Sequence, residues 1–329
     1  MRSDAIRRRR SEKMDALVHD NLAETGSEDS QSAFSATLIE ESAACNNTID
    51  SRCSIIDIKP EPLARLIGAQ VMVVDAPAGL CDLVPLAREL SERIVGETIK
   101  RSVDSGEEVP CRKGCAACCS YLVPLSTPEA LCMGREIGPL AASPDPDNAQ
   151  ALIAAAERIL TGWSKSPLFQ TGPGAVCDIE AVGLWYASLK LPCPFLDHGT
   201  CSIYDRRPLA CREHAVVGSA SHCRQYDPTV GNRLEIPAKV LDALAQVAAD
   251  LEQTEVQSVI MPLAPFWFEE NRDRALRTWP GVELVSRFLE CLSDTASQWA
   301  PDSKEIPINS FPENPLRQHS GNMVEGRAA

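Results

Sequence analysis

The sequence has 329 residues, of which 44% are hydrophobic, so it can bury the core of one large domain or two modest ones. A formal net charge of −14 and an aromatic content of 5% exclude a general nucleic-acid-binding protein, which needs basic and stacking surfaces. No apolar run approaches the roughly 18–20 residues that cross a bilayer. The arginines at 7–10 are followed by a polar segment, Ser11 to Asp20, and not by the apolar stretch of an export signal. We therefore expect a cytoplasmic protein with no membrane span and no nucleic-acid partner.

The two ends of the chain are polar. Between Met14 and Lys59 there are nine acidic and two basic side chains, with many serines, asparagines and threonines. Such a segment buries too little apolar surface to offset its ordering entropy. The sequence predicts a disordered N-terminal tail at 1–60, a cysteine-cluster metal-binding domain at 61–295 and a disordered C-terminal tail at 296–329.

Helical periodicity dominates between the tails. Asp82 is predicted to cap a helix whose apolar face carries Leu86, Leu90 and Ile94. Thr127 and Pro128 are predicted to open the next helix, which runs through 137. Apolar spacing indicates further helices around 152–163, 181–185, 240–251 and 284–292, and a short strand at 71–74. The predicted fold class is mostly α, with irregular cysteine-bearing loops and at most a short hairpin.

Fourteen cysteines are many for a reducing compartment, where clustered cysteines more often bind metal than form disulfides. The first group has the spacing CxxxCxxCC and comprises Cys111, Cys115, Cys118 and Cys119. Such short spacings let a loop curl around a metal centre. Because adjacent side chains diverge, Cys118 and Cys119 are not expected to bind the same atom. One of them could serve a second metal atom, hydrogen-bond a cluster or remain a spare thiol.

The second group comprises Cys193, Cys201, Cys211 and Cys223. The segment 193–201 is predicted to be a hairpin with its turn at 197–199. Pro208 should hold Arg207 in an extended conformation. Arg207 and Arg212 flank Cys211, and their guanidinium groups would stabilise the net negative charge of a thiolate-bound cluster, which makes them the predicted cofactor-binding residues.

The remaining cysteines and the histidines near the second group have simpler interpretations. Cys45 and Cys53 are expected in the tail, whereas Cys81, Cys132, Cys177 and Cys291 are expected to pack in the core. His222, beside Cys223, is the best alternative ligand; His198 is expected in the hairpin turn, and His214 remains a possible ligand or proton donor.

The cysteine loop together with Cys193-Pro194-Phe195-Leu196 and Arg207-Pro208-Leu209-x-Cys211-Arg212 resembles the YkgJ-like cysteine-cluster family. That family is named for its CxxCxxCC motif and is described as zinc- or iron-chelating. The chain departs from the motif in having three residues between Cys111 and Cys115, where the family has two. The resemblance implies metal binding without a settled reaction. A similar cysteine domain occurs in flagellin lysine N-methylases, which are linked to an iron–sulfur cluster and S-adenosylmethionine.

Three interpretations of function follow from these residues. The favoured one is an iron–sulfur protein, with a 4Fe–4S cluster serving electron transfer or, if the chain is an enzyme, an oxidoreductase reaction with an unknown redox or protein partner. The second is a structural zinc module for protein interaction, because thiolates accept either metal. The third, which comes from the resemblance, is a protein lysine methylase that uses S-adenosylmethionine. The sequence has no P-loop, nucleophile elbow or dinucleotide fingerprint and identifies no catalytic residue.

Overall fold

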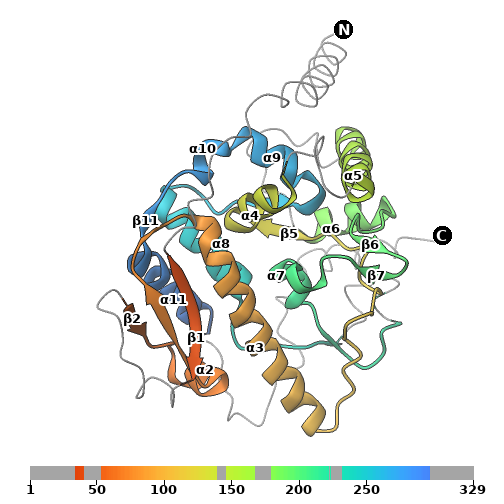
Figure 1. The fold of residues 1–329 in the computed structure, drawn as a ribbon. Helices are drawn as coiled ribbons and strands as arrows, with labels where there is room; N and C mark the ends of the chain where they lie inside the picture. The colour runs from red at the N-terminus through yellow and green to blue at the C-terminus, as the bar shows by residue number, and fades with distance from the viewer. Residues whose placement is uncertain are drawn as a thin grey trace, which may run out of the picture. The chain divides into compact units, whose positions relative to one another are not determined.

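The computed structural model describes residues 34–40, 53–138, 146–166, 179–221, 223 and 232–296. Figure 1 shows that helices predominate among them, which confirms the mostly α fold. The helices are α2 (Glu61–Ile67), α3 (Val84–Asp104), α4 (Thr127–Ile137), α5 (Pro146–Lys165), α6 (Ile179–Ser188), α7 (Leu209–Arg212), α8 (Val240–Glu252), α9 (Ala264–Glu270), α10 (Arg272–Ala275) and α11 (Gly281–Ala296). The strands that the site or the sheet uses are β1 (Ser35–Glu40), β2 (Cys53–Ile56), β3 (Ala69–Val74), β5 (Pro124–Ser126), β6 (Leu196–Asp197), β7 (Thr200–Cys201), β8 (Val216–Val217), β9 (Asn232–Arg233) and β10 (Ser258–Ile260).

The predicted helices are present, but two of their caps differ from the prediction. Ser126, not Thr127, precedes α4, and its backbone N–H and hydroxyl both donate to the Glu129 carboxylate in a capping box. Asp82 accepts a hydrogen bond from the Gly79 N–H at 2.8 Å and so closes a short 3-10 turn ahead of α3. The prediction that Asp82 caps α3 was therefore wrong: Asp82 lies in the 3-10 turn Leu80–Leu83, and α3 begins directly after that turn.

A three-stranded antiparallel sheet corrects the predicted N-terminal tail. Strand β3 lies in the centre, with β1 and β2 paired on its two edges. Val71 and Val73 are fully buried on one face of β3. Both edge strands lie within 1–60, so the prediction of disorder does not hold for 35–40 and 53–56. Their composition hides this because the pairing partner, not local apolar content, stabilises them.

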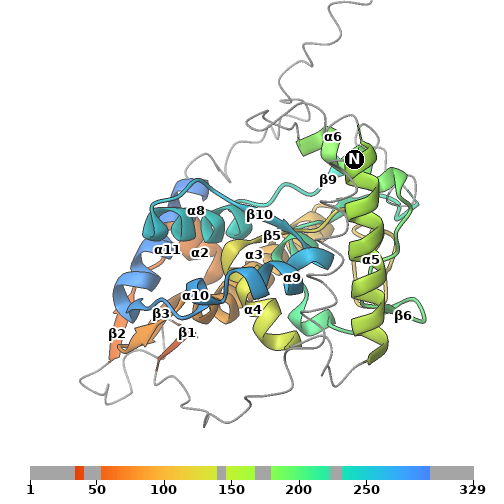
Figure 2. The same cartoon turned by 90° about the horizontal axis from the view of Figure 1, so that it is seen from above.

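The sheet packs against a helical layer. Helices α8 and α11 lie side by side (Figure 2) and contact each other, and both carry fully buried side chains: Leu244, Val247, Leu284 and Phe288. Helix α3 joins this layer through Leu86, Leu90 and Ile94, which are also buried, as their spacing predicts.

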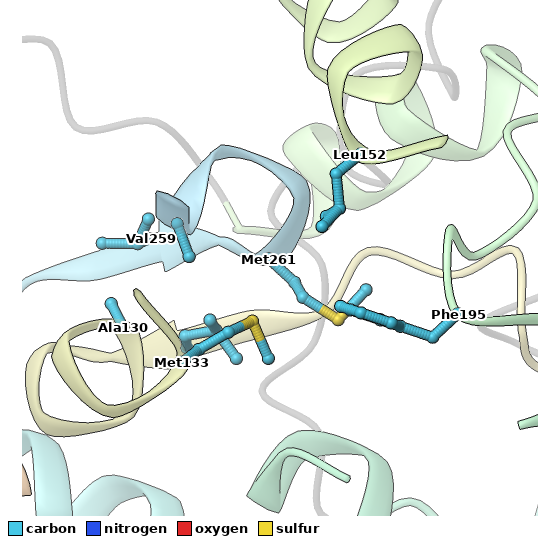
Figure 3. Packing of buried hydrophobic residues seen from close by; sticks show 8 residues of the cluster. Ala130, Met133, Leu152, Phe195, Val259 and Met261 are labelled. Atoms are coloured by element: carbon cyan, nitrogen blue, oxygen red, sulfur yellow. The ribbon is translucent and has the colours of Figure 1, made fainter. Parts of the chain in front are cut away.

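A second core connects the helices to the cysteine-bearing segments. Its members come from α4, α5, β5, β10 and the hairpin segment, and Figure 3 shows how they converge. Phe195 is 3% exposed and contacts this cluster, and Cys193 and Ile203 pack against its edge. This core therefore anchors the hairpin segment that carries Cys193 and Cys201. None of the helices in the described part of the chain is both long and apolar enough to cross a membrane.

Candidate metal centre

The first cysteine group lies in an irregular loop between α3 and β5. Two tight turns shape it: the Cys115 N–H donates to the Arg112 carbonyl at 3.0 Å, and the Cys119 N–H donates to the Ala116 carbonyl at 3.1 Å. Gly114 has a φ of 90°, which a side chain would disfavour. The loop therefore curls as its spacing predicts.

The hairpin at 193–201 is confirmed. Leu196 pairs with Cys201 across β6 and β7, and the two turn residues, His198 and Gly199, have φ values of 46° and 78°. Positive φ at both positions is the signature of the two-residue hairpin turn that matches strand twist. The Ser202 N–H donates to the Phe195 carbonyl at 2.9 Å, which extends the pairing beyond Cys201.

Cys211 lies in the short helix α7. Arg207 has φ −56° and ψ 145°, the extended conformation that Pro208 imposes. The first N–H group of α7, that of Leu209, donates to Glu129 Oε1 at 2.7 Å. Glu129 is 2% exposed, and its other oxygen already caps α4. One buried carboxylate thus connects the starts of α4 and α7. Burial raises the pKa of Glu129, and the hydrogen bonds from Leu209 and Ser126 oppose that shift.

Cys223 lies in the connection between two paired strands, β8 and β9. The Gly218 N–H donates to the Glu108 carbonyl at 2.7 Å, and the Val216 N–H donates to Cys111 Sγ at 3.4 Å. An N–H directed at a sulfur is a common way to stabilise a thiolate that binds metal. The end of the second group is therefore attached to the start of the first.

The two groups also meet at the adjacent cysteines. The Cys193 N–H donates to the Cys119 carbonyl at 2.7 Å. The hydrogen bond to Cys119, followed by burial, raises the pKa of Cys118. Burial raises the pKa of Cys193 to about 11, and nearby Cys201 and Cys118 add to this. Cys211 responds in the same direction to its burial and to Cys193, so its pKa is also raised. Cysteines far apart in sequence therefore share one electrostatic environment.

All eight clustered cysteines are free thiols in the described part of the chain. Within those same residues, no three histidine, cysteine or acidic side chains are close enough together to hold a metal ion. The donor set nevertheless suits a soft metal, because thiolates bind zinc and iron–sulfur centres. Metal binding has to draw the sulfurs closer than they lie here.

The two arginines that flank Cys211 have different surroundings. Arg212 is committed to structure: it donates to the Glu92 carboxylate at 2.6 Å and to the carbonyls of Asp205 and Arg207. The Arg207 guanidinium stacks on the Tyr204 ring at 4.2 Å, and its Nε is buried with no hydrogen-bond partner among the described residues. Burial raises the pKa of Cys111, and the positive charge of Arg207 opposes that shift.

The two described histidines near the second cysteine group have different surroundings. The side chain of His198 is 97% exposed in the hairpin turn. His214 packs edge-on against Tyr121, and burial lowers its pKa, so it is neutral; its Nε2 has no partner among the described residues. His222, Cys45 and Cys177 lie outside the residues that the structure describes. Cys81, Cys132 and Cys291 are buried, as predicted.

A hollow of about 330 Å³ lies outside the first loop. Its lining includes Cys115, Gly114 and Ala220, together with the side chains of Arg112 and Lys113. Cys115 is the only one of the eight cysteines that lines it. Solvent therefore reaches Cys115 through this depression.

Sequence reasoning missed the role of Glu129 and of Glu92. The Ser126-x-x-Glu129 spacing is a capping-box pattern and could have identified the first half of the Glu129 role. Its second contact, with Leu209, spans 80 residues and has no local signal. Nothing in the sequence distinguishes Glu92 from the other acidic residues, because its partner Arg212 lies 120 residues away along the chain.

Comparison with known proteins agrees with this geometry. The family model CxxCxxCC, described as a "putative zinc- or iron-chelating domain", matches residues 110–229. The match begins just before Cys111 and ends just after Cys223, so it contains all eight clustered cysteines. No curated protein and no solved structure matches the chain. Residues 110–229 therefore match the model of the CxxCxxCC family, the family that the cysteine motifs resemble.

Proposed function

We propose that the chain binds a 4Fe–4S cluster through its clustered cysteines and acts in electron transfer or in a redox reaction. The ligands come from Cys111, Cys115, Cys118, Cys119, Cys193, Cys201, Cys211 and Cys223. Bound there, the cluster would accept and release single electrons. The donor set supports this proposal because it is rich in thiols.

The observation that carries the proposal is the environment of Arg207. Its side chain is 19% exposed, and the charge acts on the thiols of both Cys111 and Cys118, opposing the rise in their pKa values. Arg207 is half-buried, its Nε lacks a hydrogen-bond partner among the described residues, and its contact with the Glu92 carboxylate is long, at 3.4 Å, so a further negative group nearby would stabilise its charge. A thiolate-bound iron–sulfur cluster is such a group, and it becomes more negative on reduction.

The residues around the thiols have separate tasks. The ion pair between Arg212 and Glu92 holds α7 against α3, and Glu129 accepts a hydrogen bond from the first N–H group of α7. The Val216 N–H points at Cys111 Sγ and would stabilise its thiolate. Cys193 and Cys211 are half-buried and Cys223 is buried, while the hollow beside Cys115 would give a redox partner access to that thiol.

The test is the reduction potential of charge variants. Removing the Arg207 charge destabilises the reduced, more negative state, so Arg207→Ala should lower the potential of the anaerobically purified protein. A loss of about 1.4 kcal/mol would shift a one-electron potential by about 59 mV. The matched control is Arg206→Ala, which removes the same charge from the adjacent but exposed position. Equal potentials in the Arg207 and Arg206 variants would contradict the proposed role of Arg207.

A structural zinc site is the second candidate. Strands β6 and β7 pair over only four residues and α7 has only four, so these segments have little secondary structure of their own. A zinc ion bound by four thiolates would hold such segments together without any redox role. A colourless protein with stoichiometric zinc would establish this candidate in place of the redox proposal.

A further inference from the structure

The hollow beside Cys115 carries a charge opposite to that of the chain as a whole. Its volume is about 330 Å³, and Arg112 and Lys113 are part of its lining. No acidic residue is among the described residues that line it. The whole chain, by contrast, has 46 acidic and 32 basic residues and a formal net charge of −14. The hollow is therefore a local basic site on an acidic protein, and it would attract a negatively charged group that approaches this surface.

The two cations of the lining are accessible to a ligand. Arg112 is exposed, and among the described residues its guanidinium donates only a long hydrogen bond, of 3.5 Å, to the Pro110 carbonyl. Lys113 Nζ lies 3.5 Å from Asp205 Oδ1, but both side chains are largely exposed, at 65% and 87%. Exposed ion pairs contribute little to stability, so Lys113 can exchange Asp205 for the carboxylate of a ligand.

Tyr204 positions Lys113 beside the hollow. The Lys113 ammonium group lies over the Tyr204 ring, 5.2 Å from its centroid, and the Arg207 guanidinium lies 4.2 Å from the same centroid. A cation is attracted to the face of an aromatic ring. The ring therefore limits where the ammonium group can lie while the side chain stays exposed to solvent.

The rest of the lining does not obstruct the approach to the loop. It consists mainly of small residues: Gly114, Ala116, Ala117 and Ala220. A Cβ atom added at Gly114 would meet no atom within 4 Å, so the space beside this residue is open. A group that enters the hollow can therefore come close to Cys115, which is the only one of the eight clustered cysteines in the lining.

The shape of the hollow favours a protein as its ligand. Sites for small molecules enclose most of the ligand and are lined mainly by apolar and aromatic side chains. This hollow is an open depression with exposed cations and no aromatic residue in its described lining. A carboxylate that projects from a second protein can enter it while the rest of that protein covers the exposed loop. Electron-transfer proteins use small interfaces, and complementary charges guide the encounter of two proteins.

We propose that the hollow lined by Arg112 and Lys113 is the docking site for an acidic surface of the protein with which the cysteine-bearing centre exchanges electrons. Carboxylates of that partner would pair with the two cations and lie next to Cys115. That the partner is a redox protein rests on the proposed function, whereas the recognition of an acidic surface rests on the hollow alone.

The first test measures binding to an acidic probe and does not depend on the identity of the metal. A fluorescein-labelled polyglutamate peptide is titrated with the full, metal-loaded chain, and its fluorescence anisotropy is recorded at low and high salt. We expect binding at low salt that weakens as salt rises, because the Debye length falls to about 3 Å at about 1 M ionic strength. The double variant Arg112→Gln with Lys113→Gln should bind about three- to thirtyfold more weakly.

The matched control is the double variant Lys59→Gln with Arg65→Gln. It also removes one lysine and one arginine from exposed positions, so the net charge changes by the same amount. This control should bind the peptide as tightly as the wild-type protein does. Equal weakening in the two double variants, or no binding by the wild-type protein at low salt, would overturn the proposal. Displacement of the peptide by micromolar free glutamate would also overturn it, in favour of a small carboxylate ligand.

The second test separates the docking site from the redox function. Reduced protein is oxidised in a stopped-flow instrument by hexacyanoferrate(III), which is an anion, or by hexaammineruthenium(III), which is a cation. Each complex takes one electron from the protein and becomes the iron(II) or ruthenium(II) form. Relative to the control, the Arg112 and Lys113 double variant should react more slowly with the anion and faster with the cation. Unchanged rates would overturn the docking site and leave the redox function intact. A protein that binds the peptide through the hollow but cannot be reduced would refute the redox function and leave the acidic docking site intact.

Discussion

Replacing Glu129 with alanine is the most informative single change outside the cysteines. The carboxylate is 2% exposed and accepts hydrogen bonds from Ser126 and from Leu209. It therefore caps α4 and fixes the start of α7, the helix of Cys211. Glu129→Ala removes both contacts and leaves the buried Leu209 N–H without an acceptor.

The expected loss can be estimated from the two contacts. Loss of a helix cap costs about 0.5–2 kcal/mol. An unsatisfied buried donor costs about 1–3 kcal/mol more. We therefore expect Glu129→Ala to lower the free energy of unfolding by about 2–5 kcal/mol, a large fraction of the typical stability of a domain.

The assay is urea denaturation of the metal-loaded protein, followed by circular dichroism. Chelator-induced metal release should also become faster, because Cys211 loses its anchor, and that readout separates the α7 contact from the α4 cap. The matched control is Glu283→Ala, another first-turn glutamate whose side chain is 52% exposed in an ion pair with Arg287. Exposed pairs contribute only about 0–1 kcal/mol. Equal stability losses in the two variants would refute the role given to Glu129.

Three further predictions concern the remaining structure. Gly134→Ala would place a Cβ atom 2.2 Å from Phe268 Cγ and should destabilise the protein by about 1–3 kcal/mol in thermal melts. Gly96→Ala in α3 meets no atom within 4 Å and should stabilise it by about 0.5–1 kcal/mol; a loss in that variant would contradict the packing. Deletion of residues 1–33 should preserve cooperative unfolding in calorimetry. Deletion of residues 1–59 also removes β1 and β2 and should lower the melting temperature sharply. Equal melting temperatures of the two deletion variants would mean that the sheet is dispensable. Burial raises the pKa of Cys81 and Cys291 to about 11, so about one thiol in a thousand is ionised at pH 8. Alkylation of these thiols by iodoacetamide should therefore be slow until urea unfolds the chain. Rapid labelling of the native protein would show that the thiols are accessible.

Strong local signals made the helices and the cysteine hairpin predictable. Helices α8 and α11 carry uninterrupted apolar faces, and the turn at His198–Gly199 has the composition that positive φ requires. The strands β1 and β2 could not be found in this way. They are short, lie in an acidic segment and are stabilised by pairing with β3 across 12 or more residues.

The cysteine motif was predictable from the sequence, and the set of eight ligands stays a prediction. Spacing cannot reveal that Val216 in β8 lies against Cys111, since that contact spans 105 residues of the chain. The sequence also does not reveal the difference between Arg207 and Arg212. The Glu92 carboxylate on α3 lies 2.6 Å from the Arg212 guanidinium but 3.4 Å from that of Arg207.

The metal and sulfide content of protein purified without oxygen tests the central claim most directly. We predict a brown protein with a broad visible absorption band, with iron and acid-labile sulfide in equal amounts and little zinc. A colourless protein that carries stoichiometric zinc and no sulfide would contradict the iron–sulfur proposal.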